Sequence, residues 1–110
     1  MIISTKRSLK LFLEKPRPPM VQVTVHDSID ICVEVIANNT NNCSVSIKYD
    51  TNHFKLTSGK ALDVLSGSSF SKKLSWILKA IKISNNHLLT QITAQANNMV
   101  QMSSFQIKVV

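Results

Sequence analysis

The sequence has few cysteines, glycines and aromatic residues, and it contains no long apolar run. Two cysteines in 110 residues are too few for a disulfide scaffold or a cysteine zinc site. No apolar run approaches the roughly 20 residues that span a bilayer, and the start, Met1-Ile2-Ile3, is too short for a secretory hydrophobic region. We therefore expect no membrane insertion. An excised module would carry no targeting signal, so the localisation stays open.

Acidic residues are also scarce. Six of them stand against thirteen lysines and arginines, which gives a formal charge of +7. Residues 1–17 carry five basic and one acidic residue, residues 18–63 carry three and five, and residues 64–110 carry five and none. The positive charge therefore gathers at the two ends of the chain. Such a distribution is compatible with nucleic acid, anionic lipid or an acidic protein as partner, and also with solubility alone.

Alternation of apolar and polar residues is the strongest pattern that is present. It runs along almost the whole chain and predicts an all-β protein with seven strands. The apolar members are Leu9, Leu11 and Leu13; Val21, Val23 and Val25; Ile31, Val33 and Val35; Val45, Ile47 and Tyr49; Phe70, Leu74, Trp76, Leu78 and Ala80; Leu88, Ile92, Ala94 and Ala96; and Phe105, Ile107 and Val109. Residues 74–83 also fit helical spacing, but Trp76 and the flanking strands favour a strand there.

The expected connections are rich in asparagine, which tolerates the left-handed backbone angles of tight turns. Four Asn-Asn pairs lie between alternating runs and predict three hairpin turns. They are Asn38-Asn39, Asn41-Asn42, Asn85-Asn86 and Asn97-Asn98. The proline-rich segment 15–19 predicts a connection that carries an edge strand from one sheet to the other. Residues 56–69 are the least regular, and we expect a loop with one short edge strand.

Strands with one apolar face need a partner sheet, and 110 residues with 44% hydrophobic content supply one core. We therefore expect a single domain over residues 1–110, a two-layer antiparallel immunoglobulin-like sandwich of about seven strands. Residues 1–19 form its basic edge strand and Pro-rich connection, and a closed barrel is the second choice. By parity Trp76 and Cys43 face the core and Cys32 faces outward. Two free thiols are favoured over a bridge.

The order of these features resembles bacterial adhesion-related (CARDB-type) immunoglobulin-like modules. The residues that carry the resemblance are Ile31–Ala37 with Asn38-Asn39-Thr40, Ser44–Lys48, Phe54–Leu56, Leu65–Ser69 and Leu74–Ala80. Major sperm protein and pilus chaperone folds look similar over Ile31–Ser69, and immunoglobulin-like modules of eukaryotic trafficking complexes share the pattern. The resemblance implies a sandwich fold over roughly residues 20–110 and no site residues.

Catalytic and cofactor motifs are not recognisable. Ser66-Gly67-Ser68-Ser69 lacks the spacing of a nucleophile elbow, and Gly59-Lys60 lacks the rest of a phosphate loop. The three histidines are His26, His53 and His87, and their spacing matches no zinc pattern. The acids form no closely spaced ligand loop. We therefore predict a protein that is not an enzyme and needs no cofactor or metal.

The leading hypothesis is a non-enzymatic interaction or structural module within a larger protein or assembly. Some positions that alternation predicts to face outward hold apolar residues. They are Ile77, Ile81 and Ile83, and, elsewhere in the chain, Phe12 and Ile36. Outward apolar residues suggest a surface that another protein or a neighbouring domain covers. The three isoleucines are the predicted protein contact.

The alternative hypothesis is a binder of polyanions, either nucleic acid or an acidic surface. Its predicted contacts are four lysines, Lys72, Lys73, Lys79 and Lys82. Lys73 and Lys79 share an outward parity, with the other two at the ends of the stripe. Nucleic-acid sites usually add stacking aromatics to such a stripe, and Phe70, Trp76 and Phe105 are expected to face inward. Nucleic acid is therefore the less favoured partner.

Overall fold

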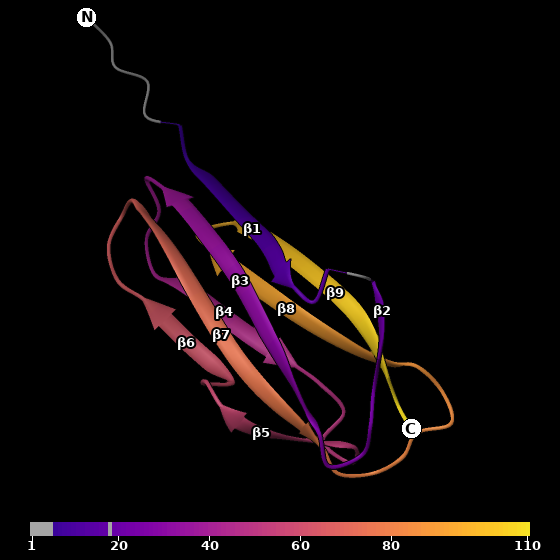
Figure 1. Ribbon diagram of the computed structural model, residues 1–110. Coiled ribbons are helices and arrows are strands. Elements are labelled where there is room, and N and C mark those ends of the chain that lie inside the picture. The colour runs from indigo at the N-terminus through magenta and orange to yellow at the C-terminus, as the bar shows by residue number, and fades with distance from the viewer. Residues whose placement is uncertain (1–5, 18) are drawn as a thin grey trace, which may run out of the picture.

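The computed structural model describes residues 6–17 and 19–110, which form nine strands and no helix. The strands are β1 (Ser8–Lys15), β2 (Met20–Val23), β3 (Ser28–Asn38), β4 (Cys43–Lys48), β5 (Phe54–Ser58), β6 (Leu62–Leu65), β7 (Phe70–Ala80), β8 (Leu88–Ala96) and β9 (Met99–Val109). They make two layered sheets, as Figure 1 shows. The predicted all-β sandwich is therefore confirmed.

The first sheet, sheet A, has the strand order β1-β3-β7-β5, and the second, sheet B, has the order β2-β9-β8-β4-β6. Sheet A is antiparallel throughout. Sheet B is mixed, because β2 runs parallel to β9 from Met20 to Val23. The proline-rich segment links β1 at the edge of sheet A to β2 at the edge of sheet B. Of the Pro-rich connection and basic start predicted for residues 1–19, residues 1–5 and Pro18 lie outside the described residues.

The core forms where the inward residues of the two sheets meet, because alternation puts every second side chain on the same face. Its largest fully buried side chains include Trp76, Phe54 and Phe105, with branched aliphatic residues from β3, β8 and β9 around them. Trp76 also donates a hydrogen bond from Nε1 to the carbonyl oxygen of Lys60 at 2.8 Å. The inward position predicted for Trp76 is therefore correct, and its one polar group is satisfied.

Residues 56–69 hold more structure than the predicted loop with one strand. Two short strands lie there, β5 beside β7 in sheet A and β6 beside β4 in sheet B. β5 is irregular, with a register shift between Leu56 and Ser58, and β6 has only four residues. Runs this short cannot show a clear alternation, which explains why nine strands are present where about seven were expected.

Two of the three asparagine turns have the left-handed backbone expected of them, and one of the three has the predicted hairpin topology. Asn39, Asn42 and Asn97 each have a φ of 54°, in the left-handed region that asparagine tolerates. Only the turn at Asn97 closes a hairpin, between β8 and β9. The other asparagine pairs lie between β3 and β4 and between β7 and β8, which belong to different sheets. The prediction of three hairpins was therefore wrong for two of them.

Candidate protein-contact surface

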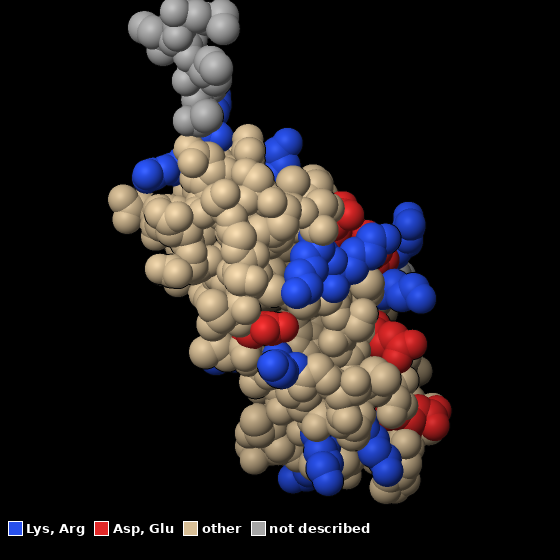
Figure 2. Space-filling model, turned by 90° about the vertical axis from the view of Figure 1, so that its left-hand side faces the viewer, with Lys and Arg blue, Asp and Glu red and all other residues tan. Residues whose placement is uncertain are grey.

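The outer face of sheet A is a charged, solvated surface. Lysines and acids share its rows: Lys10, Glu14, Asp30, Glu34, Lys55, Lys73 and Lys79 all point outward. The two signs are close together, with Lys73 Nζ 3.4 Å from Glu14 Oε1. Acidic side chains also lie among the basic ones on the side of the molecule shown in Figure 2. Charged rows of this kind are typical of a face that stays in water.

The outer face of sheet B has a different composition. We call it the charge-poor face, and its outward residues are Met20, Gln22, Ser44, Ser46, Lys48, Leu62, Val64, Leu89, Gln91, Thr93, Gln95, Val100, Met102, Ser104, Gln106 and Lys108. It carries two lysines and no acid among the described residues. The core of a protein–protein interface is likewise depleted in charge and enriched in methionine.

Strand register arranges the charge-poor face in rows. One row runs Val64, Ser44, Gln95 and Val100, and the next runs Leu62, Ser46, Thr93 and Met102. In both rows small or polar side chains on β4 and β8 lie between apolar side chains on β6 and β9. The apolar side chains are prominently exposed, at 66% for Val64 and 56% for Met102. We call these two rows the uncharged rows, because polar side chains lie along their middle, apolar side chains lie at their two ends, and no charged residue lies in either.

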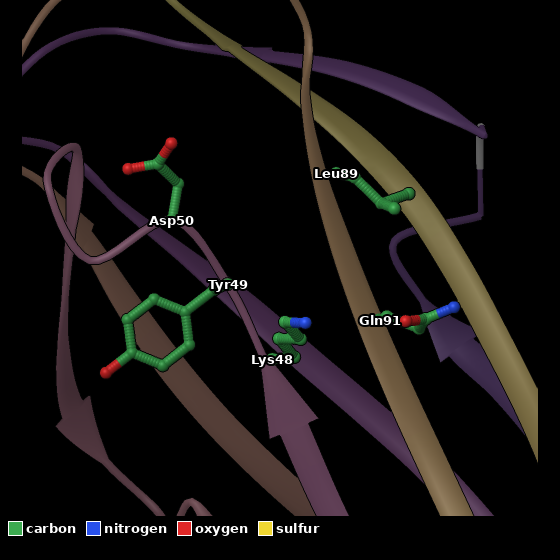
Figure 3. Close-up of a pocket in the computed structure, with 5 residues that line it drawn as sticks. All are labelled: Lys48, Tyr49, Asp50, Leu89 and Gln91. Carbon is green, nitrogen blue, oxygen red and sulfur yellow. The ribbon is translucent and has the colours of Figure 1, made fainter.

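Each end of the β4–β8 pair is hollowed. A hollow of about 530 Å³ lies at one end, where Asn41, Asn42 and Asn97 surround Ser44 and Gln95. A second hollow of about 320 Å³ lies at the other end and is shown in Figure 3. There Lys48 ends β4, Tyr49 and Asp50 follow it, and Leu89 and Gln91 lie on β8. Both hollows are lined in part by outward residues of the charge-poor face.

Asp50 at the rim of the second hollow is held by its own turn. His53 Nδ1 lies 3.0 Å from Asp50 Oδ1, and the backbone N–H of Asn52 donates to the same oxygen at 2.9 Å. The hydrogen bond from His53 lowers the pKa of Asp50, and the bond from Asn52 adds to the effect. The pair therefore fixes the turn after β4, and in doing so it shapes the second hollow.

We expect the substitution His53→Gln to raise the pKa of Asp50 toward its ordinary value, near 4, because the main hydrogen bond to the carboxylate is weakened. A lowered native pKa adds stability above the unfolded pKa, and this stability is lost as the pH falls through the native pKa. The advantage of wild type over His53→Gln should therefore be smaller at pH 2 than at pH 5. NMR titration of the Asp50 carboxyl and unfolding at both pH values would test this. The pKa of Asp50 should stay unchanged in His87→Gln.

The predicted contact residues Ile77, Ile81 and Ile83 do not share one strand face. β7 ends at Ala80, so Ile81 and Ile83 lie in the segment that follows it and are exposed. Ile77 is half-buried on the outer face of sheet A, between Asp30 of β3 and Ser58 of β5. The expected outward parity through residue 83 was therefore wrong in its extent, and a role in binding stays a prediction for all three.

The four predicted polyanion contacts are also separated. Lys73 and Lys79 point outward from sheet A, whereas Lys72 has the opposite parity and Lys82 lies beyond the end of β7. Lys73 has Glu34 as its cross-strand neighbour and pairs with Glu14. No uninterrupted basic stripe results. Polyanion binding thus stays a prediction from net charge.

Metal binding and thiol chemistry find no support among residues 6–17 and 19–110. That part of the chain holds no group of three histidine, cysteine or acidic residues able to bind a metal ion. Cys32 and Cys43 are free. Burial raises the pKa of the Cys43 thiol, which disfavours the reactive thiolate. The same residues contain no helix that is long and apolar enough to cross a membrane.

Comparison with known proteins gives matches by structure but not by sequence. No protein-family model matches, and no curated protein matches by sequence. An S-layer protein fragment, SbsC domains 4 and 5, matches with a TM-score of 0.56 at 10% identity over 98% of this chain; the chain spans 48% of that fragment. The fold is immunoglobulin-like.

Two further solved structures also match this chain. A chimeric titin Z1Z2 matches with a TM-score of 0.56 at 9% identity and covers 98% of each chain. The ASH/PapD-like domain 7 of human CEP192 matches with a TM-score of 0.52 at 10% identity, over 99% of this chain and 88% of that domain. At such identities the likeness establishes the fold alone.

Proposed function

We propose that this domain is a non-enzymatic protein-contact module and that a partner docks on the charge-poor face. The observation that carries the proposal is the contrast between the two sheets. Sheet A presents charges of both signs to water, whereas sheet B presents rows of apolar and uncharged polar side chains. A face with several exposed apolar side chains and little charge is typical of a surface that a partner covers.

The geometry also indicates what kind of partner fits. The two lysines of the face, Lys48 and Lys108, lie toward one end, and the uncharged rows lie toward the other. A partner surface should therefore be uncharged where it covers the uncharged rows, with acids only at the lysine end. A domain packed against its neighbour in a larger protein would meet these conditions. The finer relation to bacterial adhesion-related modules, and a contact through Ile77, Ile81 and Ile83, stay proposals from the sequence.

A charge placed in the uncharged rows tests the proposal. Met102→Glu should reduce partner retention at least about 10-fold, because a carboxylate would be desolvated at the centre of the contact. Met102 is exposed, so its replacement should change the free energy of unfolding by no more than about 0.5 kcal/mol. The measurement is quantitative capture from an extract of the source organism with equal amounts of each purified variant.

Asn86→Glu is the matched control, because it adds the same charge at an exposed position in the loop between β7 and β8. A protein retained by wild type and Asn86→Glu but lost with Met102→Glu supports the charge-poor face. If every partner survives Met102→Glu, the face is not the contact. Sedimentation of the domain alone would reveal whether the partner is a second copy.

A further inference from the structure

β7 is covered along only part of one side. β3 pairs with it from Phe70 to Lys79, but β5 pairs only with residues 77–80. Within the described part of the chain, no strand pairs with the second side of residues 70–76. Figure 1 shows β5 beside the C-terminal half of β7, and β6, which passes the other half in this view, pairs with β4 of sheet B. Gly59 lies against the carbonyl oxygen of Ser75, so we name Phe70–Leu74 the open edge of β7.

The direction of the backbone groups along this edge follows from β5. The hydroxyl of Thr57 donates to the carbonyl oxygen of Ile77 at 3.2 Å, so the backbone of Ile77 faces the β5 side. Backbone N–H and C=O groups alternate between the two sides of a strand, residue by residue. Those of Ser71 and Lys73 therefore face the open edge. They present two donors and two acceptors to any strand added there.

The side chains at the open edge add a specific pattern. Phe70 and Leu74 have inward parity but are only half-buried against the core. Lys72 lies between them with the same parity, is exposed, and forms no ion pair with any described residue. Its neighbour Lys73 points to the outer face and pairs with Glu14. The inward side of the open edge is thus apolar, basic and apolar in turn.

We propose that the open edge of β7 binds an extended segment of another protein by strand addition, and that this segment carries an acidic residue flanked two positions away by apolar ones. Ser71 and Lys73 would supply the backbone hydrogen bonds. The acidic side chain would lie opposite Lys72, and the apolar side chains would cover Phe70 and Leu74. This site is on sheet A and is separate from the charge-poor face.

A second copy of the chain does not fit the same edge. Pairing of two open edges would set the lysine pair Lys72-Lys73 of one copy against that of the other. Like charges directly opposite each other destabilise a strand pair. Lysine on an exposed edge is a common protection against such self-association. The charge that disfavours a second copy is complementary to an acidic segment.

The test uses a blocked synthetic peptide, Thr-Val-Thr-Glu-Thr-Val-Thr, titrated into the ¹⁵N-labelled domain. We expect the amide signals of Ser71 and Lys73 to shift and their hydrogen exchange to slow. Lys72→Glu should weaken binding at least about 10-fold and should instead favour the peptide with lysine in place of glutamate. Lys79→Glu is the matched control, because Lys79 is also exposed on β7 but lies where β5 already pairs with β7, with Lys55 as its cross-strand neighbour. Its affinity should stay within about twofold of wild type.

A peptide with N-methyl groups on the two threonines beside glutamate lacks the donors that would face Ser71 and Lys73, so it should not bind. Met102→Glu should bind the original peptide normally, which separates this site from the proposed function. The proposal is overturned if millimolar peptide leaves both amides unchanged. Equal binding of the N-methyl peptide, or an equal loss in Lys79→Glu, would overturn it as well.

Discussion

Replacing Trp76 with alanine is expected to lower the free energy of unfolding by ~3–5 kcal/mol. Trp76 is 2% exposed and lies in the centre of β7, where its ring fills the space between the sheets. Its removal leaves a cavity and also abolishes the hydrogen bond to the carbonyl oxygen of Lys60. A domain of this size is typically stable by only ~5–15 kcal/mol, so much of the margin would be lost. Urea unfolding monitored by circular dichroism is the measurement.

Trp76→Phe separates the two contributions. Phenylalanine keeps most of the packing but cannot donate to Lys60, so the loss should be smaller than for alanine, at ~1–3 kcal/mol. A loss below ~1 kcal/mol for Trp76→Ala would contradict the central position of the ring.

The second large effect is expected for Gly59→Ala. Gly59 has a φ of +92°, and an added Cβ would lie 2.5 Å from Trp76 Cδ1 and 2.7 Å from the carbonyl oxygen of Ser75. The substitution therefore combines backbone strain of ~1–3 kcal/mol with overpacking against a ring and a backbone atom, of ~1–3 kcal/mol. We expect a total loss of ~2–6 kcal/mol in the same unfolding measurement.

Gly67→Ala is the control for the strain. Gly67 has a φ of +103°, but the nearest atom to an added Cβ is Phe70 Cδ1 at 3.9 Å, which is ordinary contact. Only the strain, ~1–3 kcal/mol, should therefore appear. Equal losses in the two variants would show that the close approach of Gly59 to Trp76 contributes nothing.

The fold could be predicted because most strands are long enough to show alternation. The inward residues of β3, for example Ile31, Val33 and Val35, are completely buried as their parity indicates. The alternation of apolar residues shows which side chains face the core, but it does not show which strands pair. A left-handed asparagine reverses the chain in the same way whether the next strand joins the same sheet or the other. The hairpin at Asn97 and the crossover turn at Asn42 have the same φ of 54°. Topology therefore had to come from the structure.

The charge-poor face was missed for the same reason. One of its uncharged rows joins Leu62, Ser46, Thr93 and Met102, which come from four different strands. None of these residues is unusual within its own strand, so the pattern exists only once the strands are side by side. One signal was available, the absence of acidic residues after Asp63. The part of the chain without acids includes β8 and β9, which supply much of this face.

The predicted lysine stripe is the opposite case, because lysines that are close together in the sequence do not form one basic surface in the fold. Lys72 and Lys79 belong to one strand, but β5 covers the side of Lys79 and leaves that of Lys72 open. The cross-strand acid Glu34 lies beside Lys73 and could be identified only from the register of β3 and β7. Charge in a sequence therefore predicts a surface poorly until the neighbouring strands are known.

The central claim is that a partner covers the outer face of sheet B and leaves that of sheet A in water. Hydroxyl-radical footprinting of the captured complex against the free domain tests it most directly. The natural probes are Met20 and Met102 on the charge-poor face, at 57% and 56% exposure, and Phe12 on sheet A at 48%. We expect both methionines to be protected and Phe12 to be oxidised at an unchanged rate. Protection of Phe12 with unchanged methionines would place the partner on sheet A and contradict the account.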